Sequence, residues 1–169
     1  MENFIEIAAS AFSFNPFVTL GKEWMLITAE KEGKANTMTA AWGGFGVVWG
    51  KNAATVYIRP QRYTNEFVSA AERFSLGFFG PGFREEMNLL GSASGRDGDK
   101  IAKAGFTVAR EGGVPYIEQA QTVIFCKKLY AQQIELPLFT VPGFGEKMYP
   151  ENDPHIAYVG EIEGIWKKG

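Results

Sequence analysis

The segment of residues 34–64, KANTMTAAWGGFGVVWGKNAATVYIRPQRYT, constrains the fold more than any other part of this chain. Within 31 residues it combines two strand-like runs, a glycine-rich stretch with two tryptophans, and a run of arginine, proline and hydroxyl residues. Bare backbone, aromatic rings and cationic donors seldom occur together for packing alone. We therefore interpret this segment as a cradle for a bound cofactor.

The first strand-like run, Ala35–Trp42, carries small and polar side chains on both faces. Side chains alternate along a strand, so Asn36, Met38 and Ala40 share one face, while Thr37, Thr39 and Ala41 share the other. A plain core strand presents Val or Ile on at least one side. The pattern therefore indicates that something other than protein packs against this strand.

Four glycines follow it: Gly43, Gly44, Gly46 and Gly50. They predict a turn in which the backbone approaches a flat ligand closely. The alternative is a glycine-rich hairpin whose tryptophans, Trp42 and Trp49, belong to the core. The spacing of these glycines is one residue too long for a dinucleotide fingerprint, and a strand follows them instead of a helix, which excludes a Rossmann site.

The end of the segment predicts a strand, Ala54–Arg59, and then a helix capped by Thr64 or Asn65. The apolar face of that helix comprises Phe67, Val68, Ala71 and Phe74. Arg59, Arg62 and Thr64 then surround a helix N-terminus, where backbone N–H groups and guanidinium donors suit a phosphate. The alternative is that the two arginines pair with surface carboxylates.

A second polar stretch, GSASGRDGDK at residues 91–100, has two equally supported interpretations. It is either a solvated turn, or a loop in which Ser92, Ser94, Arg96 and Lys100 present donors to an anion beside a helix over residues 99–104.

The rest of the chain predicts mostly strands. Residues 1–23 form an extended segment broken by Asn15-Pro16. The strands that follow are expected at Trp24–Ala29, Ser75–Phe79, Phe106–Ala109, Val114–Ile117, Ala120–Leu136 and His155–Trp166, with a helix through Phe83, Met87 and Leu90. The strand Ala120–Leu136 exceeds the usual length and should bend or bulge. Leu136–Pro154 should be a long ordered loop with a functional or partner-binding role. His155 favours a structural role, capping the strand or pairing with Asp153, over a catalytic one.

Composition excludes several function classes. A chain of 169 residues favours one domain, residues 1–169. A net charge of −2 gives no basic footprint for nucleic acid, and no apolar run is long enough for a membrane span. The N-terminus lacks the pattern of a signal peptide, and a single cysteine fits a reducing cytoplasm. With one His and one Cys, we expect no metal site.

Four spaced motifs resemble those of the flavin reductase-like proteins, including flavoredoxin. They are N-x-M-T-A-A-W-G-G at Asn36–Gly44, V-Y-I-R-P-x-R-Y-T at Val56–Thr64, S-G-R-D-x-D-K at Ser94–Lys100, and D-P-H-I-A-Y-V-G-E-I at Asp153–Ile162. The resemblance implies a mainly β, Greek-key split β-barrel with a few flanking helices. It also implies a homodimer that binds FMN at the subunit interface.

The resemblance further implies the residues of the cofactor site. Those that line the isoalloxazine ring would be Asn36, Met38, Thr39, Ala40, Ala41 and Trp42, although many relatives have serine in place of Ala41. Those that hold the ribityl chain and the phosphate would be Arg59, Arg62, Tyr63, Thr64, Ser94, Arg96 and Lys100. No catalytic side chain is expected, because the flavin itself accepts a hydride from NAD(P)H.

Two other functions stay open at this level. One is an electron-transfer protein of the flavoredoxin type, which would receive electrons from a redox protein and have no nicotinamide site. The other is a non-enzymatic ligand module, since this fold also hosts haem and pyridoxal-type ligands. The set of phosphate donors favours FMN over haem.

Overall fold

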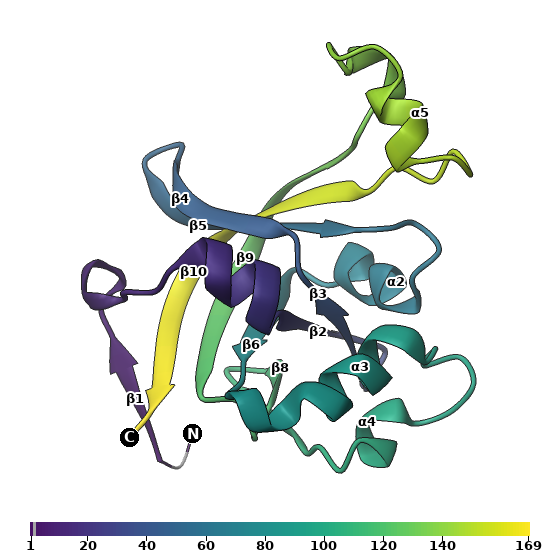
Figure 1. Ribbon diagram of the computed structural model, residues 1–169. Helices are drawn as coiled ribbons and strands as arrows, with labels where there is room; N and C mark the ends of the chain where they lie inside the picture. The colour runs from purple at the N-terminus through teal and green to yellow at the C-terminus, as the bar shows by residue number, and fades with distance from the viewer. Residues whose placement is uncertain (2) are drawn as a thin grey trace.

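The computed structural model describes residue 1 and residues 3–169, and its architecture is a mainly β, antiparallel split barrel (Figure 1). Eight strands of the described chain pair in the order β3-β2-β6-β9-β10-β5-β4, with β1 added beside β10, and β7 and β8 pair separately. The strands are β1 (Phe4–Ile7), β2 (Met25–Lys31), β3 (Lys34–Ala40), β4 (Gly43–Val48), β5 (Lys51–Ile58), β6 (Arg73–Phe78), β7 (Val108–Glu111), β8 (Val114–Ile117), β9 (Thr122–Gln133) and β10 (Ile156–Lys168).

The last strand, β10, joins the two parts of the sheet. On one side β9 pairs with it along nearly its whole length. On the other side β5 pairs with Ile156–Glu161 and β1 with Ile165–Lys168. The register between β9 and β10 shifts twice, between Val159 and Gly160 and between Ile162 and Gly164, and such shifts bend a sheet. The predicted bend in the long strand of the β9 region is therefore confirmed.

The helices are α1 (Pro16–Val18), α2 (Tyr63–Ala70), α3 (Arg84–Ser92), α4 (Lys100–Lys103) and α5 (Phe144–Met148). In Figure 1, α2, α3 and α4 lie along the β2–β3 side of the sheet, whereas α5 projects on a segment that extends from the opposite end of the molecule. Short helical turns cover Ala9–Ala11, Thr19–Glu23, Pro81–Phe83 and Leu136–Leu138. The main core lies between α2 and the inner face of the sheet, around Phe67, Phe74 and Tyr158.

Two tight turns join strands in this region, and the first of them, the polar turn before β3, is the one that the sequence predicts. Glu32 and Gly33 both have positive φ, 52° and 75°, and join β2 to β3 with Lys31 opposite Lys34. Trp49 and Gly50, with φ of 53° and 70°, join β4 to β5 in the same way. Turns with two positive φ values match the twist of a hairpin.

Several expectations were wrong. Gly43–Val48 is strand β4 and not a turn, so the alternative of a glycine-rich hairpin is correct. The tryptophans of that hairpin are not core residues, however, since Trp42 and Trp49 are 45% and 62% exposed. Residues 1–23 are not uniformly extended, because β1, α1 and two helical turns lie within them. Helix α2 begins at Tyr63 without a side-chain cap, and Phe74 lies on β6 instead of the helix face. Thr64 lies inside the helix, one residue after Tyr63, and its hydroxyl accepts from Nδ2 of Asn36 instead of capping the helix.

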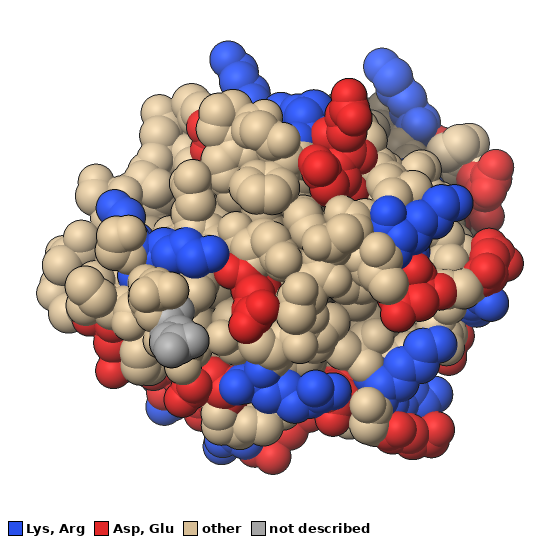
Figure 2. All heavy atoms as spheres, turned by 90° about the horizontal axis from the view of Figure 1, so that it is seen from below, with Lys and Arg blue, Asp and Glu red and all other residues tan. Residues whose placement is uncertain are grey.

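Charge is mixed on the surface. On the face seen from below in Figure 2, basic and acidic side chains are interspersed, without a broad field of either sign. Among the helices that the structure describes, none is long and apolar enough to cross a membrane.

Candidate functional site

A buried hydrogen bond joins β3 to the first turn of α2. Nδ2 of Asn36 donates to Oγ1 of Thr64 at 2.9 Å, and both side chains are buried. Gly95 packs directly against this pair: a Cβ added there would collide with the Asn36 amide and lie 2.9 Å from the Tyr63 ring. The loop of residues 91–100 is thus held against β3, which the sequence could not show.

Two cations meet at the C-terminal end of α3. Nη2 of Arg62 donates to the Gly91 carbonyl at 2.7 Å, and Nζ of Lys100 donates to the carbonyls of Leu90 and Ala93 at 2.8 and 3.0 Å. Cationic groups complement the free carbonyls and the dipole at a helix C-terminus. Burial, and then the charge of Arg62, lower the pKa of Lys100 to about 8, and burial also lowers the pKa of Arg62.

Neither cation of this pair forms an ion pair with a carboxylate within the part of the chain that the structure describes. Arg62 uses one of its five N–H groups and Lys100 two of three for the carbonyls. The pair therefore combines excess positive charge with donors still free for an anion.

The two other predicted arginines are already paired. Arg59 donates from Nη1 to Oδ2 of Asp153, an atom to which Gln61 also donates at 2.6 Å. Arg96 donates to Glu66 at 2.6 Å, and its guanidinium lies 4.8 Å from the centroid of the Tyr63 ring. Of the two alternatives for the arginines, pairing with a carboxylate is therefore correct for Arg59, whereas Arg62 has no such partner in the described chain.

The loop that precedes α4 is organised by its own polar side chains. Oγ of Ser94 accepts from the backbone N–H of Arg96 at 3.2 Å, while Asp99 caps α4 by accepting from Ile101 and Ala102. The predicted helix beside this loop is confirmed. We call the set of residues gathered here the polar corner; its members are Asn36, Arg62, Tyr63, Thr64, Ser94, Arg96 and Lys100.

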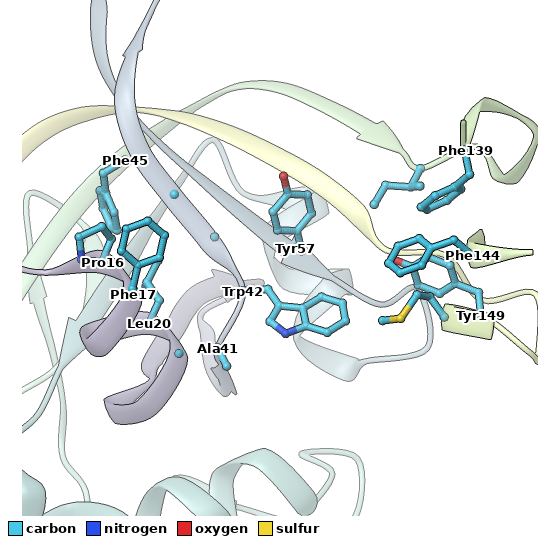
Figure 3. Close-up of a pocket in the computed structure, with 15 residues that line it drawn as sticks. Pro16, Phe17, Leu20, Ala41, Trp42, Phe45, Tyr57, Phe139, Phe144 and Tyr149 are labelled. Carbon is cyan, nitrogen blue, oxygen red and sulfur yellow. The ribbon is translucent and has the colours of Figure 1, made fainter. Parts of the chain in front are cut away.

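The second feature of the site is an apolar cleft of about 720 Å³. Figure 3 shows two aromatic walls with Trp42 and Tyr57 between them: Phe17 and Phe45 lie on one side, and Phe139, Phe144 and Tyr149 on the other. The remaining lining residues are Pro16, Leu20, Gly21, Ala41, Gly43, Gly44, Ile134 and Met148.

One face of β3 connects the cleft to the polar corner. Oγ1 of Thr39 donates to the Met87 carbonyl at 2.5 Å, and a Cβ at Gly91 would lie 3.3 Å from the Thr39 Cβ. Ala41, two residues further along, lines the cleft. Two residues of strand span about 7 Å, and Gly91, which packs on Thr39, also accepts the hydrogen bond of Arg62. Thr39 and Gly91 therefore connect the polar corner to the cleft.

His155 lies beside the cleft and is buried. Its Nδ1 is hydrogen-bonded to the Tyr149 hydroxyl at 3.0 Å, and the Trp42 ring lies 4.9 Å from its ring. Burial, and then the charge of Arg59, lower the pKa of His155 to about 4. The expected pairing with Asp153 is wrong at the level of hydrogen bonds, because Asp153 bonds to Arg59 and Gln61 instead.

The structure brings together most, but not all, of the residues predicted for the site. Seven form the polar corner, Ala41 and Trp42 line the cleft, Thr39 lies between, and Arg59 lies near the cleft, where its guanidinium is 5.6 Å from the Tyr149 ring centroid. Met38 and Ala40 instead pack into the protein core, so the interpretation that no protein packs on their face of the strand is wrong. Both side chains belong to the same buried cluster as Phe67 and Val68 of α2.

Sequence reasoning missed the aromatic walls of the cleft. Phe17, Tyr57 and Tyr149 come from three distant segments, and no local pattern joins them. The apolar character of the loop after Leu136 was the one available signal, since Phe139 and Phe144 belong to it.

Comparison with known proteins identifies the class. The fold is that of several solved structures. An FMN-binding domain of a flavin reductases-like enzyme from Shewanella baltica matches with a TM-score of 0.70 and 18% sequence identity, over 98% of this chain and 78% of that chain. Flavoredoxin from Methanosarcina acetivorans matches with a TM-score of 0.67 and 22% identity, over 85% of this chain and 67% of that chain, and the styrene monooxygenase flavin reductase from Pseudomonas putida with a TM-score of 0.62 and 13% identity, over 85% and 77%. Among curated protein sequences, no relative matches this chain significantly. These neighbours define a split-barrel protein.

The model of the flavin reductase like domain matches residues 18–168. The chain therefore belongs to the flavin reductase-like family, as its four motifs indicated.

Proposed function

We propose that this protein binds FMN and works as a reductase that transfers a hydride from NADH or NADPH to the flavin. Membership of a flavin-binding oxidoreductase family supports the general class. The observation that carries the specific proposal is the Arg62–Lys100 pair, which lacks a carboxylate in the described chain. Arg62 bonds to the Gly91 carbonyl, Gly91 packs against Thr39, and Ala41, two residues after Thr39, lines the aromatic cleft.

The residues present fit FMN in charge and in shape. A phosphate carries about −1.5 to −2 charges near neutral pH, which would balance Arg62 and Lys100. A flat ring fits against Ala41 and Trp42, where Gly44 offers bare backbone: a Cβ added to Gly44 would meet nothing within 4 Å. The ring would then lie at the edge of the cleft, and the remainder of the cleft stays open to a second substrate.

Bound FMN would supply the redox chemistry, since its ring accepts a hydride and passes electrons on. The chain's own residues have other tasks. Arg62 and Lys100 hold the phosphate, the Asn36–Thr64 bond keeps β3 and α2 in place around it, and the aromatic walls exclude water from the reacting rings. His155 keeps Tyr149 against the barrel and donates no proton in this scheme.

We further propose that residues 1–169 act as one domain in a cytoplasmic homodimer. The segment Leu136–Tyr149, which we call the arm, projects from the barrel in Figure 1. Its Leu138 and Val141 are 72% and 59% exposed, which is unusual for the free surface of a monomer. A second copy of the chain would cover these side chains.

Spectroscopy tests the proposal directly. The purified protein should show the visible absorption of bound flavin, and anaerobic mixing with NADH or NADPH should bleach that band. Rapid bleaching by a reduced ferredoxin-type protein, with none by either nucleotide, would favour an electron carrier like the flavoredoxins, whose folds match at similar TM-scores. A haem spectrum instead of a flavin spectrum would refute the FMN site itself.

A further inference from the structure

We propose that the cleft binds a flat, uncharged aromatic electron acceptor, of the quinone class, next to the flavin. This inference rests on the proposed function and names its second substrate. The lining carries the argument: it holds seven aromatic side chains, and none of its fifteen residues is Asp, Glu, Lys, Arg or His. An acceptor that is charged on its ring system, such as an iron chelate, would bring charges that this lining cannot balance.

The two walls are held firmly enough to form a binding slot. Tyr149 is 5% exposed, and its hydroxyl bonds to His155 while Arg59 lies over its ring. Phe139 packs closely against Gly145: a Cβ added to Gly145 would lie 2.9 Å from the Phe139 ring. On the opposite wall Phe45 contacts Phe14, with ring centroids 5.0 Å apart.

Exposure and shape favour a small molecule. Phe17, Trp42 and Phe144 are 86%, 45% and 45% exposed, although they line a concave space. A volume of about 720 Å³ lies within the range of small-molecule sites, and aromatic rings stack favourably on one another. These side chains lose their exposure when a ring system enters between the walls.

One polar group suits a carbonyl-bearing ring. Tyr57 stands between the walls and is partly buried. Its hydroxyl has no hydrogen-bond partner in the described part of the chain, so it is free to donate to a quinone oxygen. A phenol also discriminates little between ring sizes, so the inference covers one- and two-ring quinones.

The reaction balances without a further reagent. NAD(P)H would give up a hydride, which is two electrons and one proton, and bound FMN would supply the redox chemistry between the two substrates. The quinone would take up these electrons and this proton together with a second proton from the solvent, and would leave as the hydroquinone. The products are NAD(P)⁺ and hydroquinone, and the cleft is open to solvent for exchange of both.

A binding measurement tests the proposal without any turnover. The affinity for 2-methyl-1,4-naphthoquinone is measured by equilibrium dialysis on the FMN-loaded protein in the absence of NAD(P)H. The anionic analogue 1,4-naphthoquinone-2-sulfonate has the same rings and serves as the matched ligand. We expect the uncharged quinone to bind at least tenfold more tightly. Equal affinities, or no binding of either, would overturn the proposal.

Variants separate the cleft from the flavin site. Phe144→Asp places a charge in one wall and should weaken quinone binding at least tenfold, and Tyr57→Phe should weaken it a few-fold. Ile5→Asp, which puts the same charge on an exposed residue of β1, should leave quinone binding unchanged.

FMN content is read independently from the visible spectrum. A quinone that displaces FMN, or binding unaffected by Phe144→Asp in protein that keeps its FMN, would refute the cleft as an acceptor site. Protein that binds no FMN would refute the proposed function instead.

Discussion

Asn36 and Thr64, 28 residues apart, share a buried hydrogen bond of 2.9 Å between Nδ2 and Oγ1. The bond links β3, whose C-terminal end leads to the cleft, with the first turn of α2, which follows Arg62. Because Gly95 packs on the Asn36 amide, the same contact also positions the loop that leads to Lys100. This pair thus holds the polar corner together.

Breaking this bond should destabilise the fold and weaken FMN binding together. Thr64→Val keeps the volume but leaves the Asn36 amide unsatisfied, which costs about 1–3 kcal/mol. Denaturant unfolding of both single variants and of the double variant Asn36→Leu/Thr64→Val measures the coupling. Exposed Thr107 offers a control, since Thr107→Val should be nearly neutral. Strictly additive losses would show that the two side chains do not act as a pair.

Lys100 should make FMN binding depend on pH. With its pKa lowered to about 8 by burial and by Arg62, this ammonium loses its proton as the pH rises from 7 to 9 in the free protein. A bound phosphate stabilises the charged form, so FMN binding should take up protons near pH 8 and weaken above it. Riboflavin, which lacks the phosphate, should show neither effect in a fluorescence titration.

Substitution tests the same residue without a pH change. Lys100→Met removes the charge but keeps the buried chain, and it should weaken FMN binding about tenfold or more while affecting riboflavin far less, because a charge-assisted hydrogen bond contributes about 1.5–3 kcal/mol. Equal losses for the two ligands would show that Lys100 does not hold the phosphate.

His155 should affect stability in acid and leave the hydride transfer nearly intact. Its folded-state pKa of about 4 lies below the ordinary value of 6.5, so the unfolded chain binds a proton in this range and the folded protein does not. Stability is therefore highest above pH 6.5 and falls as the pH drops towards 4, by up to about 1.4 kcal/mol per unit. The variant His155→Gln should lose this slope in denaturation measured across that range.

The rate of flavin reduction in FMN-loaded His155→Gln should stay within about tenfold of the unsubstituted protein, a barrier change of about 1.4 kcal/mol. Stopped-flow absorbance measures it. A collapse of the rate in protein that retains its flavin would make His155 a catalytic residue.

The arm should mediate dimer formation. If a second copy covers Leu138 and Val141, then Leu138→Asp/Val141→Asp buries two charges at the interface and should shift the protein from dimer to monomer in sedimentation experiments at micromolar concentration. Exposed Ile5 and Val47 provide a doubly charged control outside the arm. An unsubstituted protein that is monomeric and still binds FMN tightly would contradict the shared interface.

Local patterns in the sequence were sufficient for most of the strands, though not for β4, and for the polar hairpin turn before β3 and the helix after Asp99. Alternation, positive-φ residues and capping side chains act over a few residues, so the sequence carries them directly. The motifs at Asn36–Gly44 and Val56–Thr64 were also sufficient to predict the family and the split barrel. Together with the motif at Ser94–Lys100 they named Ala41, Arg62 and Lys100, which the structure places in the corner and the cleft.

Only the tertiary structure decided which side of each element faces the core and which distant groups meet. Alternation placed Met38 and Ala40 together, but packing against α2 turned them inward. Arg59 and Arg62 look alike in the sequence, and they differ because Asp153 reaches one while the other faces helix carbonyls. The cleft depends on segments more than 100 residues apart, such as those of Phe17 and Tyr149. Such proximity is a property of the folded chain, because no short-range preference specifies a distance between remote residues.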